Sequence, residues 1–129
     1  MNLLDARLVR KGAGAWLAEG ADLAVPLEAE RFGGALIDGR EVTVGVRPHD
    51  LLVHQQGMNE IGEIVVEVVE ALGFESYVHG WARQAGPSIV MRLDPSASSV
   101  RVGERLKLAS APDKLHLFDR ATGASLAGE

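Results

Sequence analysis

The sequence predicts an all-β protein, and three observations support this fold class. Turn signals recur at a spacing of roughly 8–12 residues, which is typical of β-sandwiches and barrels. Between the turns lie short runs in which apolar and polar residues alternate, as they do when one face of a strand is buried. Fifteen glycines in 129 residues provide many turns. We expect a small Greek-key barrel of the OB type.

Several strands can be placed from apolar residues at every second position. These residues are Leu4, Ala6 and Leu8; Val42, Val44 and Val46; Leu106 and Leu108; and residues of the run 89–93. The first 45 residues are rich in glycine and alanine, so we expect an irregular N-terminal β extension there. Residues 46–129 then form the main barrel of a single domain over 1–129.

The segment 60–72 is ambiguous. Glu63, Glu67 and Glu70 fall at helical spacing and would form a solvated stripe on an amphipathic helix. However, Ile64 and the valines at 65, 66, 68 and 69 are β-branched, which favours a strand. In a strand, Ile64, Val66 and Val68 point inward and Val65, Glu67 and Val69 outward. Because Glu70 breaks this alternation, we predict a strand with a bulge near Val69.

After that strand, Gly73 is expected to turn the chain into a second strand that carries aromatic residues. We expect Met58, Tyr77 and Trp81 to serve in packing or in a partner surface. Residues 95–99 form a short polar loop.

Composition excludes several functions. The formal charge of −5 opposes non-specific binding to nucleic acid or anionic lipid, because both need a basic surface. An aromatic content of 5% is too low for a base-stacking platform. Without cysteine there are no disulfides, zinc–cysteine sites or thiol nucleophiles, which fits a reducing cytosol. We also expect no signal peptide and no direct membrane insertion, since no apolar run approaches the roughly 20 residues of a membrane-spanning helix.

The most informative motif is the corner Gly45-Val-Arg-Pro-His-Asp50. Pro48 has no N–H for a strand ladder and disfavours a helical conformation of Arg47, so the strand ends there. The corner therefore holds Arg47 at the rim of a β-structure. A related feature lies near the end of the chain, in Lys114-Leu-His-Leu-Phe-Asp119.

These phrases, with two others, resemble a known family. Met1-Asn-Leu-Leu, Gly45-Val-Arg-Pro, Gly62-Glu-Ile-Val-Val-Glu-Val-Val-Glu-Ala-Leu-Gly73 with Glu75 and His79, and Leu115-His-Leu-Phe-Asp119 occur in the family's order over about 120 residues. The chain is thus similar to the C-terminal transport-associated OB (TOBE) regulatory domain of carbohydrate-uptake ABC-transporter ATPase subunits of the maltose-importer type. One departure is His49, where the family usually has glutamate; Asp50 follows one residue later.

The resemblance implies a non-catalytic regulatory and dimerisation domain of the ATP-binding subunit of an importer for sugars, polyols or glycerol phosphate. It implies a homodimer, contact with membrane subunits through the full-length protein, and a regulatory protein as a further partner. The full-length subunit would be an ATPase, cytoplasmic and peripheral to the inner face of the membrane. The phosphate-binding loop is absent from this sequence, so we expect no cofactor in this chain, and ATP and Mg only on an upstream ATPase domain.

The residues expected at an interface or regulatory contact are Arg47, Pro48, His49, Asp50, Glu75, His116, Phe118 and Asp119. Arg47 is either a capping arginine at a strand end or, with Asp50, part of a twofold subunit contact, because the arginine fork pairs well at interfaces. For His116, Leu117 and Phe118 we expect alternation between surface and core, with Phe118 anchoring the barrel. The alternative is an exposed contact edge.

No catalytic or metal site is expected. His49, Asp50 and His54 lie in a predicted loop without a second pair at ligand spacing. The glutamates of 60–72 lack a nucleophile and a basic partner, and no Gly-x-Ser-x-Gly motif is present. Two alternative functions remain. The first is an oxyanion-binding transport-associated module, although the Ser-Ala-Arg-Asn phrase that such domains of molybdate systems use is absent. The second is an OB-type binder of single-stranded nucleic acid, which the negative charge opposes.

Overall fold

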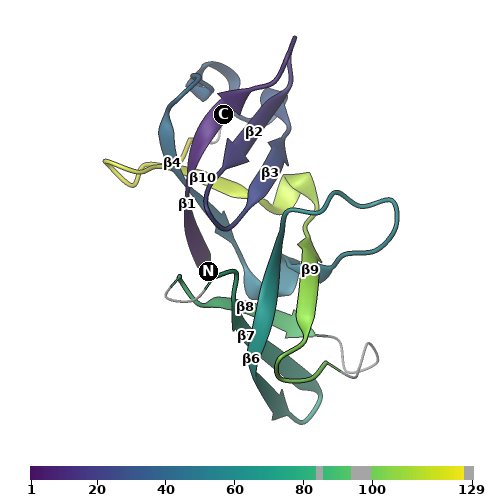
Figure 1. Cartoon of the computed structure of the whole chain (residues 1–129). Coiled ribbons are helices and arrows are strands. Elements are labelled where there is room, and N and C mark those ends of the chain that lie inside the picture. The colour runs from purple at the N-terminus through teal and green to yellow at the C-terminus, as the bar shows by residue number, and fades with distance from the viewer. Residues whose placement is uncertain (84–85, 94–99, 127–129) are drawn as a thin grey trace.

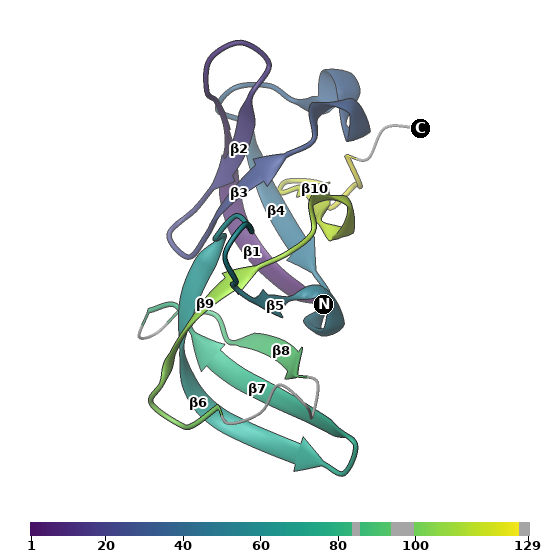
Figure 2. The same ribbon diagram turned by 90° about the vertical axis from the view of Figure 1, so that its right-hand side faces the viewer.

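The computed structural model describes residues 1–83, 86–93 and 100–126. It consists of two antiparallel five-stranded sheets, one in the upper and one in the lower half of the molecule as drawn (Figures 1 and 2). The predicted all-β class is confirmed. In the described ranges, no helix has the length and apolar character needed to span a bilayer.

Sheet A has the strand order β10-β4-β1-β2-β3. Its strands are β1 (Asn2–Arg10), β2 (Trp16–Glu19), β3 (Ala24–Leu27), β4 (Glu41–Val46) and β10 (His116–Asp119). Short 3-10 helices, η1 (Ala29–Arg31) and η2 (Gly33–Ala35), connect β3 to β4. The sheet thus combines the beginning of the chain with its last strand.

Sheet B has the order β5-β9-β6-β7-β8. Its strands are β5 (Leu52–Val53), β6 (Gly62–Leu72), β7 (Glu75–Trp81), β8 (Ile89–Leu93) and β9 (Arg105–Ala109). The 3-10 helix η3 (Pro48–Asp50) leads from β4 into this sheet, and η5 (Pro112–Lys114) leads from β9 back to β10. The loop predicted at 95–99 lies outside the described residues.

The N-terminal residues are more regular than the expected irregular extension. β1 pairs with β4 from Asn2 opposite Val46 to Arg7 opposite Glu41, and its second half pairs with β2. The regular part is β1, a nine-residue strand, whereas β2 and β3 have four residues each. The boundary between an extension and a main barrel at residue 45 stays a prediction. Sheet A draws strands from both sides of it.

The ambiguous segment 60–72 is a strand, as predicted, and it carries a bulge. The register against β7 shifts between Val66 and Val68, so the bulge lies at Glu67, before the expected position. Ile64 and Val66 are buried as predicted. Beyond the bulge the faces exchange: Val69 packs against the core, whereas Val68 is exposed. The expected inward position of Val68 is wrong because the extra residue comes earlier.

The apolar core is one cluster that joins the two sheets. The alternating residues predicted for three strands are all in it: Leu4, Ala6, Leu8, Val42, Val44, Val46, Leu106 and Leu108. In the run 89–93, the side chains of Ile89, Met91 and Leu93 are buried. Asn2 is the only polar side chain among the buried residues of the described ranges. It lies where β1 of sheet A meets β8 of sheet B.

Candidate functional site: the outer face of sheet A

The outer face of sheet A, opposite the core, gathers several predicted site residues. In β1 the residues at even positions from Asn2 to Leu8 are buried, so Leu3, Asp5 and Arg7 point outward. The register of β10 on β4 sets His116 opposite Gly45 and Phe118 opposite Thr43. Because directly paired residues share a face of the sheet, His116 and Phe118 lie on the outward side. Leu117, between them, is buried.

Phe118 therefore does not anchor the core, contrary to the expectation. The core anchors of this segment are Leu115 and Leu117, each with 1% of its surface exposed. Strand alternation allows only one of two neighbouring residues to face inward, and the register gives that position to Leu117. The alternative, an exposed contact edge, describes His116 and Phe118 better. Their rings stack with centroids 6.4 Å apart.

An apolar surface has formed over Gly45. A Cβ at Gly45 would lie 2.6 Å from Met1 Sδ, 2.9 Å from Phe118 Cε2 and 3.4 Å from Leu3 Cδ2. These side chains therefore pack over the bare glycine backbone. Met1 and Leu3 remain more than half exposed, at 53% and 56%. We call Met1, Leu3, Gly45, His116 and Phe118 the β10 face.

A cavity of about 370 Å³ adjoins the β10 face. Its lining is Met1, Leu3, Thr43, Phe118, Asp119, Arg120 and Gly123. Such a recess, with an apolar floor and charged groups at one side, has the composition of a contact surface with an apolar centre and a polar rim.

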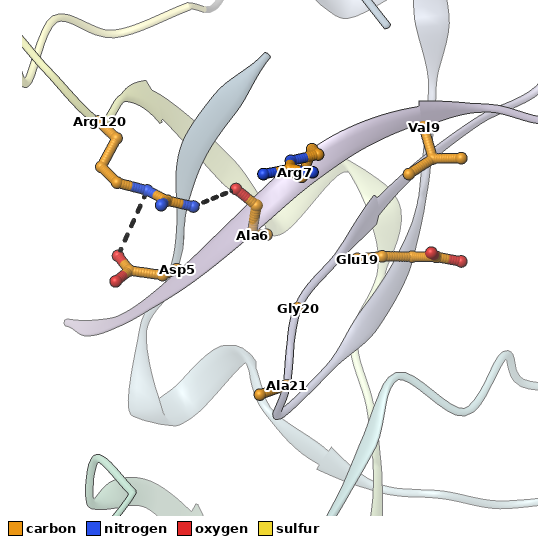
Figure 3. Close-up of a pocket in the computed structure, with 8 residues that line it drawn as sticks. All are labelled: Asp5, Ala6, Arg7, Val9, Glu19, Gly20, Ala21 and Arg120. Carbon is orange, nitrogen blue, oxygen red and sulfur yellow. Dashed lines mark hydrogen bonds and ion pairs between the residues drawn. The ribbon is translucent and has the colours of Figure 1, made fainter. Parts of the chain in front are cut away.

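The charged rim centres on Arg120 (Figure 3). Its Nη2 donates a hydrogen bond to the backbone oxygen of Ala6, its Nε lies 3.8 Å from Asp5 Oδ1, and its Nη1 lies 3.7 Å from Glu41 Oε2. Glu41 also pairs with Arg7 at 3.6 Å. A second cavity, of about 550 Å³, is lined by Asp5, Ala6, Arg7, Val9, Glu19, Gly20, Ala21 and Arg120. Opposite charges alternate across this rim.

Gly20 brings the β2–β3 turn against β1 in this second cavity. A Cβ at Gly20 would lie only 2.2 Å from the backbone oxygen of Asp5. A residue with a side chain cannot make this approach without moving the backbone, so glycine is needed here for close contact. The turn and β1 together form one wall of the charged cavity (Figure 3).

Asp119 has a structural role beside the face. Arg40 Nη2 donates to its Oδ2 at 2.9 Å, and the backbone N–H of Thr122 donates to its Oδ1 at 2.9 Å. The Arg40 hydrogen bond, followed by the backbone donor, lowers the pKa of the Asp119 carboxyl. Asp119 thus ties the end of β10 to the approach to β4.

The proline corner lies at the end of β4, as predicted. β4 ends at Val46, and Pro48 opens η3, whose Asp50 N–H donates to the Arg47 oxygen at 2.9 Å. Arg47 and His49 are exposed. The Asp50 side chain is 15% exposed, with an oxygen 3.8 Å from His49 Nε2. Since Gly45 pairs with His116, the corner lies next to the β10 face along the same strand.

Glu75 lies elsewhere. It begins β7, directly after the β6–β7 turn, at the end of the molecule remote from β10 in both views (Figures 1 and 2). Its carboxylate pairs with Arg92 at 3.3 Å and accepts a hydrogen bond from the Tyr77 hydroxyl at 3.2 Å. Loss of solvation, followed by the Glu75 charge, raises the pKa of the Tyr77 hydroxyl. Glu75 therefore belongs to a different surface from the other predicted site residues.

Four residues of this surface were not among the site residues predicted from the sequence: Met1, Leu3, Gly45 and Arg120. The alternation of β1 carried a signal, because Leu3 is apolar at a position that the buried residues Leu4, Ala6 and Leu8 assign to the outside. No signal in the sequence pointed to the role of Gly45, because that role depends on which side chains pack over its backbone. Among the described residues, no group of three histidine, aspartate or glutamate side chains could hold a metal ion.

Comparisons with known proteins agree on one family. The family model described as the MalK OB fold domain matches residues 1–51, and the model described as the TOBE domain matches residues 44–118. The chain is 40% identical over 128 residues to an sn-glycerol-3-phosphate import ATP-binding protein of Cereibacter sphaeroides, covering 98% of this chain and 32% of that protein. The protein of the same description from Chromobacterium violaceum is 34% identical over 122 residues, covering 95% and 30%.

The chain thus spans about a third of the length of these relatives. Among solved structures, the cytoplasmic molybdate-binding protein ModG matches with a TM-score of 0.62 and 19% identity, covering 90% of this chain and 94% of that one. At this identity the likeness shows the fold alone. It supports the predicted OB-type architecture.

Proposed function

This chain belongs to the TOBE domain family, and we propose that it is the regulatory and dimer-forming domain of the ATP-binding subunit of an ABC importer. The relatives that match over nearly the whole chain are import ATP-binding proteins for sn-glycerol 3-phosphate, so glycerol phosphate or a related polyol or sugar is the proposed cargo. The alternatives, an oxyanion-binding module and a binder of single-stranded nucleic acid, are not favoured.

The proposed role is mechanical and not catalytic. A contact between two copies of the domain keeps two ATPase domains at a high effective concentration for each other. A regulator that binds one arrangement of the copies better than another shifts the population of the subunit pair. In the full-length protein the domain lies at the cytoplasmic side of the membrane, where the ATPase domains engage the membrane subunits. ATP and Mg belong to those ATPase domains.

The observation that carries this proposal is the β10 face, an exposed apolar surface in the described part of the chain. Its charged rim supports a second copy as the occupant: Arg7 and Arg120 alternate with Asp5, Glu19 and Glu41, so two copies related by a twofold axis can oppose unlike charges. Arg47 and Asp50 adjoin the face at the proline corner. We assign Arg47 to the rim of the contact, and Asp50 to holding the corner in place.

The test is the dimer dissociation constant of the full-length subunit, measured by sedimentation equilibrium. Leu3→Lys places a charge on the β10 face and is expected to weaken the dimer by about tenfold or more, because an apolar contact is replaced by a desolvated cation. Val102→Lys is the matched control, since Val102 is also an exposed aliphatic residue, at 67%, but lies in the turn before β9.

Equal dimer constants for the two lysine variants would remove the β10 face from the contact. An unchanged constant for Arg47→Ala would remove only Arg47 from its rim. A full-length subunit that stays monomeric at every concentration would contradict the proposed role itself.

A further inference from the structure

The hairpin of β6 and β7 carries an apolar surface on its outer side. Val69 and Val78 form a pair on the core side, so the neighbouring pairs, Val68 with His79 and Glu70 with Tyr77, point outward. On the other side of the bulge, Val65 pairs with Trp81 and also points outward, because Ile64 and Val66 are buried. We call Val65, Val68, Leu72, Tyr77 and Trp81 the hairpin face.

This composition is unusual for the solvent side of a sheet. An antiparallel sheet with one face on the core ordinarily has polar residues on its other face. Here Val68 is 46% exposed and Leu72 53%, and Phe74 in the turn beyond them is 84% exposed. Val65, Tyr77 and Trp81 are partly exposed. The hairpin forms the end of the molecule away from sheet A (Figures 1 and 2). Exposed apolar side chains gathered on one sheet face are typical of an interaction site.

The surroundings of the hairpin face are acidic. Between Arg47 and Arg83 the sequence has no lysine or arginine, but five glutamates and one aspartate. Three basic residues of the neighbouring strands share this side of the sheet, since Arg105 is opposite Val65, Arg92 opposite Tyr77 and Lys107 opposite Glu63. Each pairs with a glutamate: Arg105 with Glu63 and Arg92 with Glu75, both at 3.3 Å, and Lys107 with Glu60 at 3.8 Å. Glu67 and Glu70 have no arginine or lysine partner in the described ranges, and Glu70 lies 3.6 Å from His79. The apolar surface therefore lies in a field of net negative charge.

We propose that the hairpin face is a docking site for an amphipathic helix of a partner protein that carries lysine or arginine beside its apolar face. An open sheet face buries its apolar side chains most readily under a helix. The seven steps from Val65 to Leu72 cover about 23 Å, at about 3.3 Å per residue, which matches about 15 residues of helix. Basic side chains along the helix edges then meet Glu67 and Glu70.

The negative charge also argues against other occupants. A second copy of this hairpin would bring the same excess of glutamates to the contact, and Glu67 and Glu70 would gain no basic partner from it beyond the arginines that already pair with Glu63 and Glu75. Anionic lipid and nucleic acid are repelled for the same reason. The hairpin face is therefore a second surface, and its occupancy does not depend on how copies pair through the β10 face.

The probe is a fluorescein-labelled model peptide of about 18 residues, built only from leucine on one helical face and lysine on the other. Its binding to the protein is measured by fluorescence anisotropy between about 50 and about 300 mM salt. We expect saturable binding that weakens as salt rises. The same peptide with glutamate in place of lysine is expected to bind at least about tenfold more weakly, because like charges then meet.

Two variants locate the site. Val68→Thr with Leu72→Thr keeps exposed residues of good strand propensity while removing apolar contact, and should weaken binding by roughly tenfold at all salt concentrations. Glu67→Gln with Glu70→Gln should mainly reduce the salt dependence. The matched control for charge is Glu28→Gln with Glu30→Gln, at exposed positions around η1. Circular dichroism checks that each variant is folded.

The proposal would be overturned if neither hairpin variant changed the affinity for the lysine peptide. It would also be overturned if the control with Glu28→Gln and Glu30→Gln lost as much affinity as the variant with Glu67→Gln and Glu70→Gln. Absence of binding by the lysine peptide would overturn it as well.

Discussion

The side chain of Asn2 pairs with the backbone of Val90 through two hydrogen bonds of 2.8 Å each. Asn2 Nδ2 donates to the Val90 oxygen, and the Val90 N–H donates to Asn2 Oδ1. An edge strand would otherwise leave these groups unpaired. Because Asn2 begins β1 and Val90 lies in β8, one carboxamide satisfies the edge of sheet B from the first strand of sheet A. The link is nearly buried, with Asn2 7% exposed.

Replacing Asn2 by alanine should therefore lower the free energy of unfolding by about 2–4 kcal/mol, because two hydrogen bonds are lost and buried backbone groups are left unpaired. Asn2→Asp should also destabilise, since a carboxylate accepts from the Val90 N–H but cannot donate to its oxygen. Urea denaturation followed by circular dichroism measures both. A loss below about 0.5 kcal/mol for Asn2→Ala would show that water replaces the pairing.

Leu117 and Phe118 distinguish the core from the β10 face. Leu117→Ala should cost about 2–5 kcal/mol, the usual range for a buried leucine. Phe118→Ala should cost clearly less, because Phe118 lies on the outer face and is only partly buried. Urea midpoints of the two variants give the comparison. The reverse order would restore Phe118 as the anchor of this strand.

Gly45 and Gly80 should respond differently to alanine. At Gly45 the clashing atoms are the ends of the Met1 and Phe118 side chains, which can move, so the cost should stay within about 1 kcal/mol, and better strand propensity offsets part of it. At Gly80 a Cβ would lie 2.5 Å from the backbone oxygen of Val65, so Gly80→Ala should cost about 1–3 kcal/mol. Thermal unfolding of the two variants under identical conditions measures the difference. Equal losses would mean that the strands around Gly80 adjust freely.

Asp119 should make stability depend on pH. Its pKa is lowered in the folded protein, chiefly by the Arg40 hydrogen bond, so its contribution is present above the pKa of the unfolded chain, near 3.8. That contribution is lost as pH falls through the lower folded value. We expect Asp119→Asn to be less stable than the wild type at pH 6 to 7, with the difference shrinking below about pH 4. Urea titrations at a series of pH values test this, and a difference constant down to pH 2.5 would contradict it.

Much of this protein is determined by local pattern. Alternation in β1, β4 and β9 predicted which side chains are buried. A strand has only two faces, and the apolar face is buried because this removes its side chains from water. Pro48 predicted the end of β4, since proline cannot continue a strand ladder. The motifs from Gly45-Val-Arg-Pro to Leu115-His-Leu-Phe-Asp119 also predicted the family that the comparisons found.

What the sequence left open depended on pairing between distant segments. The bulge falls at Glu67 and not near Val69, because the register of β6 is set by its neighbours β7 and β9. Leu117, and not Phe118, reaches the core because β10 pairs with β4 in one register. The β10 face arises only when residues from both ends of the chain lie side by side over Gly45. Alternation determined that strands form and that one side of each is buried. Only tertiary pairing decided which residues share the exposed surfaces, because hydrogen bonds between strands distant in the sequence fix the register.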